Sequence, residues 1–176
     1  MQWLRESLPK VPREYRVSMC YIALSGLRPS EACESATLVH NLSAQGRLAE
    51  YYDKELCLLS HFSYPKIFLR NTKNAFISFI SPALIKVVSD SRPLSYMAVQ
   101  CALWKYNCEP IQTKGLRKYY ATLVKSKLDN DMTDLMQGRL DPRVLLRHYV
   151  RPILAELRDK VLTAIKPLEE ELLALV

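Results

Sequence analysis

Apolar residues recur every three or four positions along most of the chain, the spacing that places them on one face of an α-helix. Residues 14–25 show this spacing, and a second helical stretch follows that should run to about Leu42. Gly26 and Pro29 separate the two, since glycine commonly ends a helix and proline suits the first turn of the next. The pattern therefore predicts two helices joined by a tight turn.

The helical spacing is lost in residues 55–80. Three short segments rich in bulky apolar residues, "ELCLLSHF", "KIFLR" and "AFISFI", are separated there by the turn-like sequences "SYP" and "NTKN". Short apolar runs bounded by turn residues are typical of antiparallel strands. We therefore expect each segment to be a strand of one small antiparallel sheet, with "NTKN" closing a hairpin.

Helical spacing returns after this sheet. The predicted helical segments are "PALIKVV", "PLSYMAVQCALWKY", "TKGLRKYYATLVKSKL", "DMTDLMQG" and "DPRVLLRHYV". The tail, residues 153–176, is also helical in spacing, but Pro167 should interrupt it because an interior proline removes a backbone hydrogen bond. The expected fold class is mainly α with a small antiparallel β-sheet, an α+β arrangement.

Composition adds a partner to this picture. A chain of 176 residues fits one domain of ordinary size, and its formal net charge is +7. The tail after residue 152 holds three basic and five acidic side chains, which leaves 22 basic and 13 acidic residues before it, a net charge of +9. Such an excess favours a polyanionic partner, first of all nucleic acid, over a surface of merely solvated lysines.

The cysteines and the apolar runs indicate the compartment. Five cysteines form no pair at zinc-binding spacing, and an odd count without a signal peptide is typical of reduced intracellular thiols. No apolar run approaches the roughly 20 residues that span a bilayer. We therefore expect an intracellular, cytoplasmic protein with no metal and no membrane contact.

Near the end of the basic region, several cations lie close in sequence to one tyrosine. These residues are Arg139, Arg143, Arg147, His148, Tyr149 and Arg151. A phenol in water has a pKa of about 10 and is a poor nucleophile at neutral pH, but nearby positive charge favours the phenolate. The cluster is therefore either an ordinary basic helix face or a place where Tyr149 attacks a phosphate.

Catalysis of phosphoryl transfer depends mainly on positioning and on stabilising charge at the nonbridging oxygens, and arginine can bind two such oxygens at once. Such a site needs cations from separate segments, one tyrosine and an acid for the leaving hydroxyl. The candidates in this sequence are Arg28, Lys73, Lys114, Arg117, Arg139 and Tyr149. Lys114 and Arg117 are three residues apart, so they share one face of a helix.

In order, these segments resemble the sequence boxes of the catalytic domain of tyrosine recombinases. "LSGLRPSEA" is similar to the first-arginine box, with Glu31 three residues after Arg28, and "KGLRKYYATLVKSKL" is similar to the H/K-x-x-R helix. "MQGRLDPRVLLRHYV" is similar to the L-G-H box and nucleophile segment. Lys114 and Arg139 depart from the bacterial pattern and are similar to the variant of archaeal fusellovirus integrases. The resemblance covers residues 14–152.

The resemblance implies a site-specific DNA recombinase, or integrase, that cleaves and rejoins double-stranded DNA at the attachment sites of viral or plasmid DNA. Tyr149 would attack a DNA phosphate, forming a 3′-phosphotyrosyl bond and releasing a 5′-hydroxyl. Lys73 would protonate the leaving oxygen, although Arg70, three residues earlier, is an alternative for this position. The covalent bond would keep the energy of the phosphodiester, so the family's chemistry needs no metal, cofactor or ATP.

The same resemblance assigns the phosphate shell. Arg28 and Arg117 would bind the nonbridging oxygens, and Lys114 and Arg139 would complete the shell. Glu31 would orient Arg28 rather than act as a base. The other arginines near the tyrosine would contact the DNA backbone or pair with acidic groups rather than catalyse. Contacts to the backbone add affinity and salt dependence without sequence choice.

Two regions follow from the resemblance: residues 1–152 as the catalytic domain, with the tyrosine recombinase catalytic-domain fold, and residues 153–176 as a C-terminal helical tail. In the family the last helix often docks on a neighbouring protomer, so the tail predicts a homo-oligomer on DNA, a tetramer. Alternatively, the tail packs on the chain's own core. Recombinases of this type usually carry an N-terminal DNA-binding domain, so we expect an excised fragment that alone binds DNA weakly and without sequence preference.

Two other functions stay open at this point. A type IB topoisomerase-like enzyme uses the same phosphotyrosine to relax DNA. A basic helical module could also bind DNA without any chemistry, in which case replacing Tyr149 by phenylalanine would leave every activity unchanged.

Overall fold

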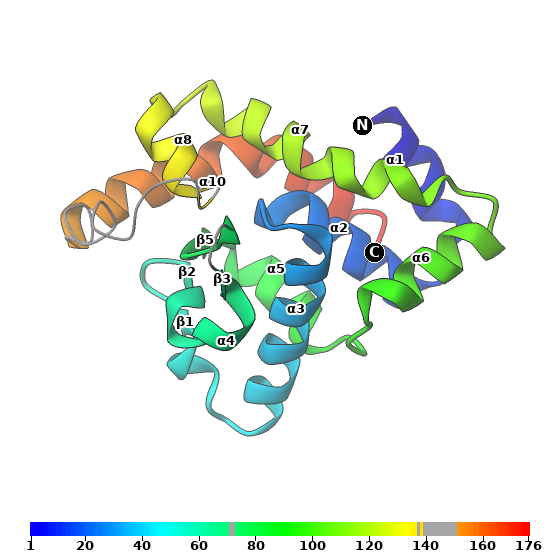
Figure 1. Ribbon diagram of the computed structural model, residues 1–176, viewed down its shortest axis with the longest axis horizontal. Helices are drawn as coiled ribbons and strands as arrows, with labels where there is room; N and C mark the ends of the chain where they lie inside the picture. Colours follow the sequence, from blue (N-terminus) through cyan, green and yellow to red (C-terminus); the bar gives the residue numbers. More distant parts are fainter. Residues whose placement is uncertain (71–72, 137, 139–150) are drawn as a thin grey trace.

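The computed structural model describes residues 1–70, 73–136, 138 and 151–176, and for Arg70, Lys73, Ile111, Arg151 and Pro152 it describes the backbone alone. Helices form most of the described molecule, and small β-structures lie together beside them (Figure 1). The fold is therefore mainly α with a small antiparallel sheet, which confirms the fold class expected from the sequence.

Most helices lie close to the predicted segments. The helix bounds are α1 (Gln2–Ser7), α2 (Arg13–Ser25), α3 (Pro29–Ala44), α4 (Pro65–Phe68), α5 (Pro82–Ser89), α6 (Tyr96–Lys105), α7 (Thr113–Lys125), α8 (Asn130–Met136) and α10 (Arg151–Leu173). However, α1 and α4 were not predicted as helices, and the helix predicted over residues 141–150 lies outside the described residues. The predicted break at Pro167 is wrong, because α10 continues through it. Burial of Ile165, Leu168 and Leu172 stabilises by about 1.5–3 kcal/mol each, and the three together exceed the roughly 3 kcal/mol cost of an interior proline.

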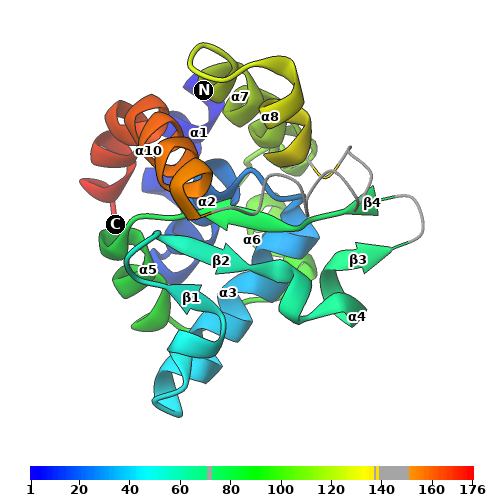
Figure 2. The ribbon, with the colours of Figure 1, turned by 90° about the vertical axis from the view of Figure 1, so that its left-hand side faces the viewer.

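Two antiparallel β-structures follow α3. Strands β1 (Tyr52–Asp53), β2 (Leu58–Ser60) and β5 (Ile77–Phe79) form a sheet in the order β1-β2-β5. Strands β3 (Leu69–Arg70) and β4 (Lys73–Asn74) pair separately, with Arg70 opposite Lys73, so the prediction that all the segments join one sheet is wrong. This pairing confirms the hairpin predicted at "NTKN", and Figure 2 shows it on the opposite side of the molecule from α10.

The prediction of a strand over the whole of "KIFLR" is wrong in its first part, which forms α4. Pro65 occupies the first turn of this short helix, where its fixed φ angle suits helical backbone. Phe68, the last residue of α4, is fully buried with its ring centroid 4.5 Å from that of His61. Only Leu69–Arg70 of the segment is extended.

Helix α2 lies at the centre of the core. Its residues Val17 to Ser25 are all buried, and a helix buried on every side belongs in the interior of a domain. Helices α3, α5, α6, α7 and α10 all pack against it. The C-terminal end of α2 is therefore held from several directions, and this end leads directly into Arg28.

Helix α10 packs on the chain's own core. Its buried apolar residues are Leu154, Leu157, Val161, Ile165, Leu168 and Leu172. This is one of the two arrangements considered for the tail, and exchange between protomers stays a prediction. Although α10 has 23 residues, neither it nor any other helix in the described part is long and apolar enough to cross a membrane.

Candidate active site and DNA-binding groove

The junction between α2 and α3 is fixed by Gly26. Its φ angle is +70°, in the left-handed region that glycine adopts readily, and it ends α2 as the sequence predicts. A Cβ atom at this position would lie 2.4 Å from a ring carbon of Tyr120. Tyr120 belongs to α7, so the absence of a side chain at Gly26 lets α7 approach the start of α3.

Arg28 is the N-cap residue of α3 and is held by Glu31. The backbone N–H of Arg28 donates to Glu31 Oε2 at 3.2 Å, and Arg28 Nη1 donates to Glu31 Oε1 at 2.7 Å. The Glu31 side chain is only 1% exposed, whereas that of Arg28 is 27% exposed. Glu31 thus contacts Arg28 as expected for an orienting partner, and part of the guanidinium stays accessible.

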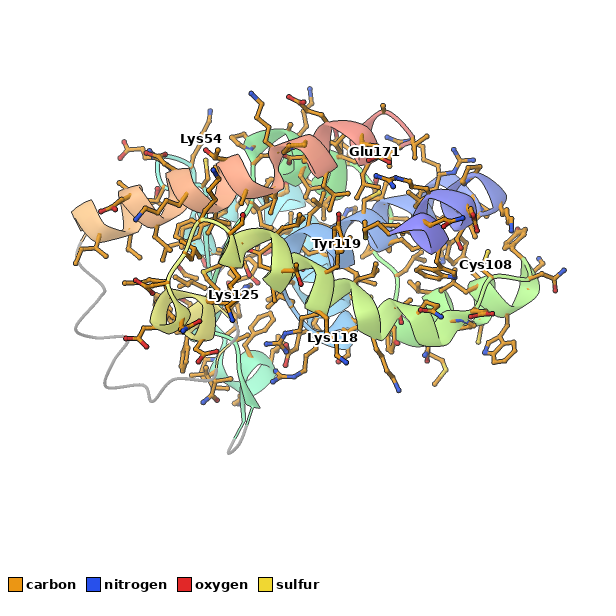
Figure 3. All side chains as sticks on the ribbon, turned by 90° about the horizontal axis from the view of Figure 1, so that it is seen from above. Lys54, Cys108, Lys118, Tyr119, Lys125 and Glu171 are labelled. Carbon is orange, nitrogen blue, oxygen red and sulfur yellow. The ribbon has the colours of Figure 1, made fainter. Side chains whose placement is uncertain are left out.

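Helix α7 has one buried face and one basic, exposed face. Leu116, Tyr120 and Val124 are buried, whereas Lys114, Lys118 and Lys125 are exposed. The three lysines follow the spacing i, i+4 and i+11, which is one side of a helix. In Figure 3, Lys118 and Lys125 lie along α7, with Tyr119 on the side towards α10.

A groove of about 1060 Å³ lies along this basic face, beside the start of α3 and α8. Among the described residues that line it, the charged ones are Arg28, Lys114, Arg117, Lys118, Lys125 and Asp134. Five positive charges against one negative charge create a field that attracts phosphates. The face from Lys114 to Lys125 is about 16 Å long along the helix axis, enough for several phosphates of one DNA strand.

The groove brings together three of the six predicted catalytic residues: Arg28, Lys114 and Arg117. They come from the start of α3 and from the first turns of α7, which are far apart in sequence. Arg117 is half-buried at the border between the basic and the buried faces of α7. This convergence is the arrangement that a phosphate site requires.

The other three candidates are Lys73, Arg139 and Tyr149. Arg139 and Tyr149 lie outside the described residues, as do Arg143, Arg147 and His148. The backbone of Lys73 forms β4, and the choice between Lys73 and Arg70 stays a prediction.

One contact links the hairpin to the chain that leads to Arg139. A Cβ atom on Gly138 would lie 1.5 Å from the backbone oxygen of Asn74, so Gly138 is packed directly on β4. Gly138 also has a φ angle of +62°, which glycine adopts readily. The residue after Lys73 therefore touches the residue before Arg139.

Lys118 and Lys125 also line the groove, although neither was among the predicted site residues. Their spacing from Lys114 was a usable signal, because residues four and eleven positions apart share a helix face. No local sequence pattern marks His61, which is completely buried and hydrogen-bonded through both ring nitrogens. Within the described ranges, no three His, Cys, Asp or Glu side chains cluster as metal ligands.

Fold and groove together define a class: a mainly helical domain with a cationic surface suited to a phosphodiester backbone. A family model described as archaeal phage integrase matches residues 6–165. The chain therefore belongs to the archaeal phage integrase family, which gives it a role in DNA integration and makes DNA its substrate. No curated protein and no solved structure matches the chain, so the specific recombinase fold stays a prediction.

Proposed function

We propose that the chain is the catalytic domain of a tyrosine recombinase, which cleaves and rejoins DNA through a 3′-phosphotyrosyl intermediate. The observation that carries the proposal is the convergence of Arg28, Lys114 and Arg117 on one groove. Three cations from two separated segments are more than a solvated helix face requires, and they suit the nonbridging oxygens of one phosphate.

In the proposed reaction, Tyr149 attacks the phosphorus as the phenolate that nearby positive charge favours, and the bond from phosphorus to the 5′ oxygen breaks. Arg28 and Arg117 stabilise the negative charge that builds on the nonbridging oxygens, and Lys114 adds a third positive charge. Lys73 gives a proton to the leaving 5′ oxygen. The 5′-hydroxyl of a partner strand then gives its proton back to Lys73 and attacks the phosphotyrosine, which restores a phosphodiester and frees Tyr149 as the phenolate.

Two features of the described structure support the roles of Lys73 and Arg139. The β3–β4 hairpin carries Lys73, and Gly138, next to Arg139 in sequence, packs on that hairpin at Asn74. These segments are separated by more than sixty positions in sequence, so their contact is tertiary. It supports the idea that Lys73 and Arg139 belong to one site.

The groove beyond the catalytic cations extends the proposal to DNA binding. Lys118 and Lys125 continue the basic face of α7, and Thr122 also lines the groove. Contacts of this kind fix the DNA backbone without reading sequence. Oligomerisation on DNA through α10 remains part of the proposal, with the same contacts made on a neighbouring protomer.

A suicide substrate tests the proposed chemistry. A nicked duplex, as a mixed pool of sequences, is incubated with the chain and EDTA, and protein–DNA adducts that resist SDS are measured. We expect an adduct with the wild type and with Tyr15→Phe, a matched control at the start of α2, and none with Tyr149→Phe. Relaxation of supercoiled DNA without strand exchange would instead favour a topoisomerase-like enzyme, and an adduct that survives in Tyr149→Phe would refute the proposal.

A further inference from the structure

A chain of hydrogen bonds runs through the core and ends at the α2–α3 junction. Its members are Tyr21, Ser35, Tyr51, His61, Ser78 and the carbonyl of Ser25, and all are buried. Successive distances are 2.7 Å from Tyr21 Oη to Ser35 Oγ, 2.9 Å on to Tyr51 Oη, 2.7 Å to His61 Nδ1, 2.9 Å from His61 Nε2 to Ser78 Oγ and 3.0 Å to Ser25 O. The chain joins α2, α3, the sheet region and β5.

The last member of this hydrogen-bond chain, the carbonyl of Ser25, determines which atom donates and which accepts in every bond. A carbonyl can only accept, so Ser78 donates its single proton to Ser25 and must accept from His61 Nε2–H. His61 is neutral because burial lowers its pKa to about 3, so its Nδ1 carries no proton and accepts from Tyr51. All the bonds therefore point towards the carbonyl of Ser25.

Ser25 is three residues before Arg28, and its carbonyl belongs to the last turn of α2. The last carbonyls of a helix have no partner within the helix, so Ser78 supplies one from β5. Ser25 Oγ also accepts from the backbone N–H of Leu27 at 3.3 Å. Together with the close approach of Gly26 to Tyr120, these two bonds hold the backbone that leads from Ser25 to Arg28.

We propose that His61 and Ser78 are positioning residues for Arg28: they fix the carbonyl of Ser25 and thereby the place from which Arg28 reaches the phosphate. Neither His61 nor Ser78 is among the described residues that line the groove, so we infer that they act through the α2–α3 junction. The effect on catalysis rests on the proposed function. The effect on anion binding at Arg28 does not depend on it.

The first test compares two variants that each remove one hydroxyl from the same network. Ser78→Ala removes the donor to Ser25 and the acceptor for His61, so we expect adduct formation to slow at least roughly tenfold. Tyr21→Phe removes only the first donor and leaves every later bond in place, so its rate should stay within about twofold of wild type. Thermal unfolding of both variants provides the measure of general core damage.

A double-mutant cycle with Arg28→Lys separates positioning from loss of stability. If Ser78 acts through Arg28, Ser78→Ala should slow the Arg28→Lys protein by less than about twofold. A full tenfold loss in both backgrounds would overturn the inference, as would equal losses in Ser78→Ala and Tyr21→Phe. His61→Gln, which keeps a donor for Ser78, should recover most of the rate that His61→Phe loses.

A second readout needs no cleavage. Inorganic phosphate is titrated while the Nε–Hε resonance of Arg28 is followed by NMR. Ser78→Ala should weaken phosphate binding at Arg28 at least roughly threefold, and Tyr21→Phe should not change it. If the wild type forms no adduct, the proposed function fails while this titration still decides the positioning of Arg28, and equal affinities in all three proteins would refute it.

Discussion

Arg28 Nη1 lies 2.7 Å from Glu31 Oε1, and this carboxylate is almost completely withdrawn from solvent. An exposed pair with the same sequence spacing, Arg47 and Glu50, also has a 2.7 Å contact, but about half of each side chain is exposed. The two pairs differ mainly in burial, so they separate the role of a buried orienting carboxylate from that of a surface ion pair.

We predict that Glu31→Gln slows DNA cleavage by about tenfold or more, because a neutral amide holds the guanidinium of Arg28 less firmly. Glu50→Gln should leave the rate unchanged, since exposed pairs contribute little. Single-turnover adduct formation measures both. Equal rates for Glu31→Gln and wild type would show that Arg28 needs no orienting partner.

We predict that Gly26→Ala lowers the free energy of unfolding by about 2–4 kcal/mol, from the left-handed φ angle and from overpacking against Tyr120. Urea unfolding followed by circular dichroism measures this loss. Gly46→Ala is the matched control, because Gly46 has a φ angle of +68° with nothing within 4 Å of an added Cβ. A loss no greater than that of Gly46→Ala would mean that the contact with Tyr120 relaxes freely.

We predict that Lys118→Ala and Lys125→Ala each reduce the slope of log K against log salt concentration for DNA binding by about 1, because each lysine neutralises one phosphate. Lys54→Ala is the control. Lys54 is exposed, and in Figure 3 it lies on the other side of α10 from Lys118 and Lys125. Fluorescence anisotropy over a range of salt gives the slopes. If Lys54→Ala changes the slope as much as the groove variants do, the groove is not the DNA-binding surface.

We predict that stability falls as the pH drops from about 6.5 towards 3, because His61 has a pKa of about 3 in the folded chain and an ordinary one when unfolded. In this window the unfolded state binds a proton that the folded state does not, at about 1.4 kcal/mol per pH unit. His61→Gln should flatten the dependence between pH 5 and 6.5, as measured by urea unfolding. An unchanged slope in that variant would assign the effect elsewhere.

Local sequence patterns predict much of this molecule. The turn at Gly26, the helix start at Pro29 and the hairpin turn between Arg70 and Lys73 follow from backbone preferences of neighbouring residues. All three are present. The position of Lys114 and Arg117 on neighbouring turns of one helix face follows from their spacing alone. Convergence of Arg28 with α7 was inferred from resemblance, and its physical cause is the space left by Gly26.

Other features depend on contacts between residues distant in sequence. His61 and Ser78 are seventeen positions apart in sequence, and no local signal pairs them or directs Ser78 to Ser25. Proline preference predicts a break at Pro167, but burial on both sides of it keeps α10 continuous. In each case tertiary packing overrides or adds to the local preference.

The most direct measurement of the central claim is the identity of the residue joined to DNA. The adduct from a nicked suicide duplex is digested with nuclease and trypsin, and the modified peptide is sequenced by mass spectrometry. Because Pro152 follows Arg151, trypsin should release Tyr149 in the peptide of residues 148–158. We predict a nucleotide attached through its 3′ phosphate to Tyr149. Attachment to any other residue, or through a 5′ phosphate, would contradict the proposed mechanism.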